Sequence, residues 1–206
     1  MANELFKKAA ESSLENAEQW ISDASLLIEA GNHEHAFSLL AFADEEIAKA
    51  YVCWLVSEDM IPEDSKYVRD AFSDHWSKLQ TLLGLELAPF FRAAYELLKK
   101  DTERSKRDLK EEDISRFFDW MDEMVAFRQR MRNVGMYVGL DEKKREIQSP
   151  KSIEKEPCEN LLKGVNRRLR AVREVMTRTT ESQKTEMRRI FKKIPKAAWK
   201  TGEIEV

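Results

Sequence analysis

Apolar side chains recur at spacings of three and four along most of the chain, which is the pattern of helices that bury one face. The first stripe predicts a helix over residues 4–30, and the second predicts a helix over 33–57. Gly31 suits the residue just after a helix, and Asn32 suits the N-cap of the next one. Because the break is so short, we predict that the two helices pack as an antiparallel hairpin.

Three further helices are predicted after this hairpin. They cover about residues 66–83, 86–104 and 113–137. Gly84 interrupts the pattern between the first two, and Pro89 suits the first turn of the second. The charged stretch that follows, KKDTERSKRDLKEED, predicts a solvated helix end and then a loop.

The C-terminal part combines a loop with a basic helical region. Residues 138–157 contain one Gly and two Pro, so a loop is predicted there, and a basic helical region is predicted over about 158–193. No segment shows the alternation that is typical of strands. We therefore predict an all-α fold, with one helical domain over residues 1–194 and a loose tail over 195–206.

Composition agrees with a helical protein of the cytoplasm. The chain has 206 residues, 35% charged and 42% hydrophobic, which is enough for one domain with a core. No apolar run approaches the roughly 20 residues that cross a bilayer, and the start, MANELFKKAAESSLENAEQW, lacks the apolar region of a signal peptide. The two isolated cysteines, Cys53 and Cys158, indicate a reducing compartment. We expect a cytoplasmic protein without membrane contact.

The net charge of −3 hides an asymmetry. Between Lys163 and Lys200 there are 13 Lys or Arg against 3 Asp or Glu, a local net charge of +10 that leaves −13 for the remainder. Such a segment attracts polyanions such as RNA. It can equally be a helix face docked on the acidic part of the same fold, and the sequence leaves both interpretations open.

The stretch AFADEEIAKA, residues 41–50, is the first candidate for chemistry. Glu45 and Lys49 lie four residues apart with the acid first, the favourable orientation for an ion pair on one helix face. The alanines around them keep the surface small, so that another helix can approach closely. The alternative is an ordinary surface pair, which contributes little.

The stretch SDHWSKL, residues 73–79, is the second candidate. His75 and Lys78 lie three residues apart and share a helix face. One His, one Lys and one Asp do not form a metal-ligand set, and His33 and His35 do not share a face. The chain has no Gly-rich phosphate loop either. We expect neither a metal nor a cofactor.

The stretch RMRNVGMYVG, residues 130–139, is the third candidate. Asn133 and Tyr137 lie four residues apart on one face, and the long side chain of Arg132 reaches the same region. Gly135 relaxes the turn between them. An arginine fork and an amide suit a phosphate group. The alternative is a plain helix end, in which these residues are caps and surface pairs.

These segments together resemble one family. A helix of the type LLAFADEEIAKA, then HWSKL, then RNVGMYVG, is similar to the AbiV family of abortive infection proteins, which belongs to the all-helical HEPN superfamily. The resemblance covers about residues 14–180, and HAFSLLAFADEEIAKAYV and RNVGMYVGLD carry most of it. It implies a HEPN-like bundle with an antiparallel pair of long helices and extra C-terminal helices, and a role in phage defence.

Many HEPN proteins are metal-independent ribonucleases whose motif is Arg, a polar residue, three variable residues and His. Arg132 and Asn133 match its start, but Tyr137 stands where the His would be. A histidine titrates near neutrality and can move protons at pH 7, whereas a tyrosine ordinarily titrates near pH 10. Tyr137 therefore suits a proton or hydrogen-bond donor better than a base.

Two hypotheses follow for the function. In the first, the chain is a ribonuclease in which Arg132 holds the scissile phosphate, Asn133 orients it and Tyr137 acts as acid or donor. Glu45 or Lys49 from the second helix then completes the pocket, with His75 and Lys78 in support. In the second, the chain is a non-catalytic dimer that binds a phage protein or a ribosomal component.

A homodimer is expected in both cases. The resemblance implies a cleft shared between two copies. The predicted fifth helix also carries more large apolar residues than one buried stripe needs; the alternative is a helix buried deep in a monomer. These residues are Phe117, Phe118, Trp120, Met121, Met124 and Phe127.

Overall fold

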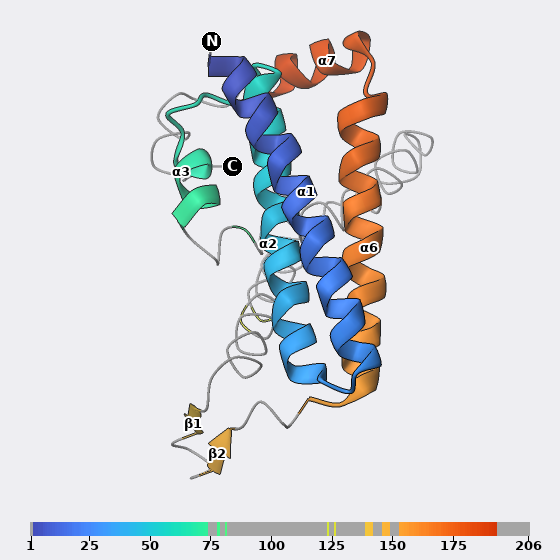
Figure 1. Ribbon diagram of the computed structural model, residues 1–206. Helices are drawn as coiled ribbons and strands as arrows, with labels where there is room; N and C mark the ends of the chain where they lie inside the picture. Colours follow the sequence, from blue (N-terminus) through green and yellow to red (C-terminus); the bar gives the residue numbers. More distant parts are fainter. Residues whose placement is uncertain are drawn as a thin grey trace, which may run out of the picture.

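The structure, a computed structural model, is a helical fold built on three long helices (Figure 1). It describes residues 2–73, 78, 81, 123, 126, 139–141, 146–148 and 153–192. The described helices are α1 (Ala2–Glu29), α2 (His33–Ser57), α3 (Lys66–Ser73), α6 (Lys155–Arg178) and α7 (Glu181–Phe191). The predicted all-α class is confirmed. None of these helices has the length and apolarity needed to cross a bilayer.

Helices α1 and α2 form the predicted antiparallel hairpin, and they share the largest helix–helix interface described. Gly31 lies at the turn with φ +77°, the left-handed conformation that glycine adopts without a Cβ clash. The Asn32 amide donates to the Leu27 carbonyl at 2.8 Å, which satisfies an orphan acceptor at the end of α1. The Asn32 side chain does not cap α2; its oxygen contacts the His35 ring instead.

Helix α2 is the central element of the core. It contacts α1, α3 and α6, so it is apolar around most of its circumference, as buried helices are. One cluster of buried side chains joins the middle of α2 to α1 and α6, and a second surrounds the C-terminal end of α2. Figure 1 shows α6 beside α1 and α2, and α7 crossing their upper end.

The helices predicted between residues 66 and 137 are described only in part. Helix α3 begins at Lys66, as predicted, and residues 78 and 81 are also helical. Residues 123 and 126, within the predicted fifth helix, are helical as well. The remainder of that helix lies outside the described residues, together with the predicted helix 86–104 and the tail 195–206. The apolar side chains behind the dimer prediction also lie there.

The loop predicted over 138–157 contains two short strands and the first residues of α6, so this prediction is wrong in part. Strands β1 (Gly139–Asp141) and β2 (Glu146–Gln148) pair antiparallel, with Leu140 opposite Ile147. Three residues are too few to display an alternating pattern, so periodicity did not reveal them. Helix α6 also begins at residue 155, before the predicted end of the loop.

The basic helical region predicted over about 158–193 consists of two helices. Helix α6 ends at Arg178, and α7 begins at Glu181. Thr180 and Gln183 form a capping box, in which each side chain bonds the backbone of the other. The sequence TESQ carries this signal, because a threonine followed three residues later by glutamine is a helix start.

Candidate functional site

Two adjacent carboxylates lie buried in the middle of α2. The Asp44 side chain is 2% exposed and the Glu45 side chain is 6% exposed. Ala41 and Ala48, both buried, have small side chains, so neighbouring elements can pack close to the two acids. A buried carboxylate is costly unless it is paired and hydrogen-bonded. The partners of these two acids therefore define the centre of the site.

Asp44 binds Arg168 of α6 through two hydrogen bonds. Arg168 Nε lies 2.8 Å from Asp44 Oδ1, and Nη2 lies 2.6 Å from Oδ2. The Arg168 side chain is 5% exposed. This two-point geometry is the arrangement in which a guanidinium and a carboxylate offset their desolvation best. The pair ties α6 to α2 across 124 residues of sequence.

Gly164 makes room for that guanidinium. A Cβ built at Gly164 would lie 3.2 Å from Arg168 Nη1 and 3.4 Å from Nη2. Glycine is the least favourable ordinary residue inside a helix, so its place one turn before Arg168 has a packing reason. Sequence reasoning missed both Asp44 and Arg168. The available signals were an acid within the alanine-rich apolar pattern of α2 and a Gly four residues before a basic residue.

Glu45 pairs with Lys78, not with Lys49. Lys78 Nζ lies 3.6 Å from Glu45 Oε2, and the Lys78 side chain is buried. Lys49 instead binds Glu46 at 2.6 Å and lies 6.0 Å from the centre of the Phe72 ring. The expected Glu45–Lys49 pair is therefore replaced, because Glu45 faces the interior and Glu46 shares the more open face with Lys49. Lys49 is already neutralised and is not a free cation.

The structure thus brings together Glu45 and Lys78 of the predicted supporting residues, with Lys49 close by on α2. His75, Arg132, Asn133 and Tyr137 lie outside the described residues. Their convergence with Glu45 stays a prediction.

The basic helices are docked on the acidic part of the same fold. Arg173 of α6 binds Glu18 of α1. Glu58, which follows α2, accepts from Lys184 at 2.8 Å and from Arg188 at 3.3 Å, both on α7. The hydrogen bond to Glu58 is the main reason why the pKa of Lys184 is raised. Of the two open interpretations of the charge asymmetry, internal docking accounts for these cations.

The two cysteines are not poised for nucleophilic chemistry. Burial raises the pKa of Cys53 to about 11, with Lys49 lowering it and Glu46 raising it. Burial and the nearby Glu159 raise the pKa of Cys158 to about 11 as well. Both thiols are therefore protonated near neutral pH, and the thiolate is the reactive form. In the part of the chain that the structure describes, no His, Cys, Asp and Glu side chains group as a metal site.

Comparison with known families gives one match. The family model described as AbiV, of the HEPN type, matches residues 5–170. The match includes α1, α2 and most of α6, and with them the Asp44–Arg168 pair and the segment from Arg132 to Tyr137. Searches of curated proteins and of solved structures give no significant match. The chain belongs to the AbiV family of the HEPN superfamily.

Proposed function

We propose that this protein is an abortive-infection protein that acts on RNA in phage-infected cells, with Arg132, Asn133 and Tyr137 at its active site. The observation that carries the proposal is the family match over residues 5–170, which contains an Arg-Asn pair followed four residues later by a phenol. The buried acids of α2 lie in the same matched region and supply a rigid wall for such a site.

The proposed roles follow from the chemistry of each group. The Arg132 guanidinium binds the scissile phosphate and stabilises its added negative charge, and the Asn133 amide orients it. The ribose 2′-oxygen attacks phosphorus and releases its proton to water, while the 5′-oxygen leaves with a proton from the Tyr137 hydroxyl. The products are a 2′,3′-cyclic phosphate and a 5′-hydroxyl, and no metal enters the reaction.

The acid cluster supports this site by positioning. Glu45 is held by Lys78 on one side, and we assign it the further role of holding Arg132. Lys49 forms an ion pair with Glu46, so the charge of Lys49 is offset. We therefore assign phosphate binding to Arg132. We assign a supporting role to His75, which precedes Lys78 by three residues.

RNA cleavage in the presence of EDTA tests the proposal. Purified protein is incubated with total RNA, and the new ends are analysed for a cyclic phosphate. We expect cleavage by the unaltered chain and at least about a hundredfold less by Arg132→Ala, the loss typical of one charge-stabilising group. Lys8→Ala is the matched control, because it also removes one positive charge and Lys8 is exposed on α1, outside the basic segment 163–200. Equal cleavage by the Arg132→Ala protein would reject the assignment.

A second candidate function is a non-catalytic dimer that binds a phage protein or a ribosomal component. Two observations favour it. Tyr137 replaces the histidine of the ribonuclease motif, and cations of α6 and α7 are used within the fold instead of being left for RNA. Persistent inertness towards RNA, combined with phage protection and a dimer mass in light scattering, would select this second function.

A further inference from the structure

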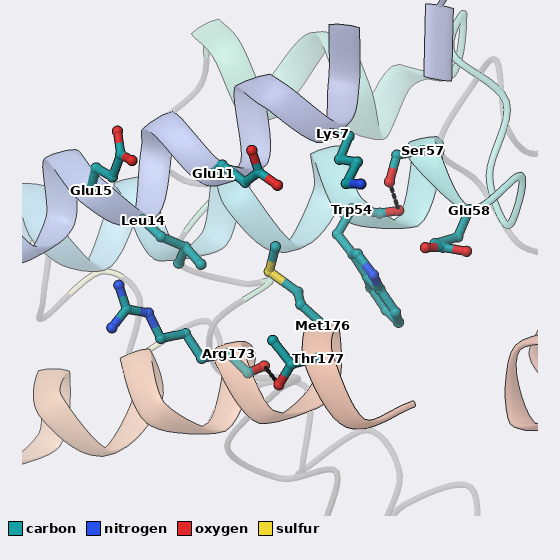
Figure 2. A pocket seen from close by; sticks show the side chains of 10 residues that line it. All are labelled: Lys7, Glu11, Leu14, Glu15, Trp54, Ser57, Glu58, Arg173, Met176 and Thr177. Carbon is teal, nitrogen blue, oxygen red and sulfur yellow. Dashed lines mark hydrogen bonds between the residues drawn. The ribbon is translucent and has the colours of Figure 1, made fainter. Parts of the chain in front are cut away.

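A pocket of about 390 Å³ lies between the first half of α1, the C-terminal end of α2 and the last turns of α6. Its apolar floor consists of Leu14, Trp54 and Met176, and Ser57 and Thr177 lie at its edge (Figure 2). The volume falls within the range of small-ligand sites. None of the lining residues belongs to the site proposed for RNA, so this inference stands apart from the proposed function.

Some of the charged side chains on the rim of the pocket form ion pairs with described residues, and others do not. Glu58 binds Lys184 and Arg188, and Arg173 binds Glu18. In the part of the chain that the structure describes, Glu11 and Glu15 carry no such partner, nor does Lys7.

The rim charges without a described partner are therefore two carboxylates, those of Glu11 and Glu15, and one ammonium, that of Lys7. Glu11 and Glu15 lie one turn apart on α1, so both border the same pocket. A cation is favoured over an anion there, because a phosphate or carboxylate would meet like charge.

Trp54 supplies a second and independent sign of a ligand. The residue is 4% exposed, and its ring is stacked on Tyr51 with 5.8 Å between centroids. Its indole Nε1 is a buried donor with no acceptor within hydrogen-bond distance in the described part of the chain. An unmade hydrogen bond of this kind is unusual in a folded core. The flexible Met176 side chain lies beside the ring in Figure 2 and can shift to admit an acceptor.

We infer that this pocket binds an arginine residue in a peptide segment of another protein. A guanidinium presents a planar fork of donors, which suits two carboxylates one helical turn apart. The methylene stem of arginine suits the floor of Leu14 and Met176. The carbonyl of the same residue is the acceptor that Trp54 lacks. Figure 2 shows Lys7 and Trp54 at one end of the pocket and Glu15 at the other, which orients the peptide.

A titration followed by NMR tests the inference on the full chain. The chain has five tryptophans, so ¹⁵N labelling gives five indole signals, and Trp54→Phe identifies that of Trp54. The probe is N-acetyl-arginine amide, and its neutral isostere N-acetyl-citrulline amide is the control ligand. We expect a saturable shift of the Trp54 signal with the arginine probe below about 10 mM, and binding about tenfold weaker with the citrulline probe. The Met176 methyl signal, assigned with Met176→Leu, is a second reporter should Trp54→Phe fail to fold.

Matched variants isolate the role of the acids. Glu11→Gln combined with Glu15→Gln is expected to weaken binding of the arginine probe about tenfold. Glu4→Gln combined with Glu29→Gln makes the same charge change on the same helix outside the pocket, and binding should stay unchanged. Equal shifts with both probes, equal binding by the Glu11 and Glu15 variant, or no shift at all would overturn the inference. Dissociation of a homodimer by the arginine probe would assign the pocket to a second copy of this chain and would overturn it too.

Discussion

Asp44 of α2 and Arg168 of α6 form a buried ion pair with two hydrogen bonds, at 2.8 and 2.6 Å, in the centre of the helical core. The pair connects distant parts of the family match, since Asp44 lies in its first third and Arg168 near its C-terminal end. Any movement of α6 against α2 would separate two buried charges, so the pair fixes the register of the two helices. This fixed frame carries Glu45, the neighbour of Asp44, and through it Lys78.

Removing one partner of this pair should be costly. Asp44→Ala leaves the Arg168 charge buried without its carboxylate, and we expect a loss of about 3–5 kcal/mol in the free energy of unfolding. Urea denaturation followed by circular dichroism measures it. Asp44→Leu combined with Arg168→Met should recover most of the loss, because an apolar pair leaves no buried charge. A double variant as unstable as Asp44→Ala would contradict this account.

Gly164→Ala should reverse the usual sign of a helix substitution. Alanine in place of glycine normally stabilises a helix interior by about 1 kcal/mol. Here the new Cβ would lie 3.2 Å from Arg168 Nη1, and Arg168 is held by Asp44 and cannot retreat freely. We expect a lower midpoint in urea for Gly164→Ala alone, and a higher midpoint when the same change is made in an Arg168→Met background. Stabilisation in both backgrounds would show that Arg168 yields without cost.

Glu58→Gln should loosen α7 without unfolding the three long helices. Helix α7 has no fully buried residue, and Glu58 binds both Lys184 and Arg188. The substitution weakens these ion pairs but keeps the Glu58 carbonyl, which accepts from Arg188 Nε at 2.7 Å. Hydrogen exchange should therefore accelerate in α7 and not in α1 or α2. Glu174→Gln, which affects an exposed pair within α6, is the matched control and should leave α7 unchanged.

The cysteines should react slowly with Ellman's reagent in the native protein. A pKa near 11 instead of the ordinary 9.0 leaves about a hundredfold less thiolate at pH 8. The rate per thiol should rise steeply when the chain is unfolded in urea. Because the folded pKa is raised, this contribution to stability is complete below pH 9 and is lost as the pH rises towards 11. Cys53→Ala should reduce the fall in stability over that interval, and fast labelling at pH 8 would count against buried thiols.

Tyr137→Phe separates a chemical role from a structural one, because it removes only the hydroxyl. If Tyr137 donates the proton in RNA cleavage, the rate should fall about a hundredfold or more while the helical circular dichroism signal stays the same. Tyr67→Phe, on the exposed side of α3, is the matched control. Unchanged cleavage by Tyr137→Phe would remove the phenol from the mechanism.

The local features of the fold were accessible from the sequence. The stripes of α1 and α2 and the glycine between them predicted the hairpin, because helix periodicity and the left-handed turn at Gly31 depend on residues close in the chain. The start of α3 at Lys66 followed from the same logic. The strands β1 and β2 were not predicted, because three residues are too few to show an alternating pattern. The helix start at Thr180 was not predicted either, because a basic helical pattern continues on both sides of it.

Pairing across the core was decided only by the tertiary structure. The sequence showed an acid at 45 and a base at 49 and favoured their pairing, yet in the fold Glu45 pairs with Lys78 and Lys49 with Glu46. Asp44 and Arg168, 124 residues apart, could not be matched by spacing at all. A buried charge takes the partner that packing places beside it, because desolvation penalises every arrangement in which it stays unpaired. Composition therefore determined how many charges the chain carries, whereas the packing of α6 on α2 determined which of them meet.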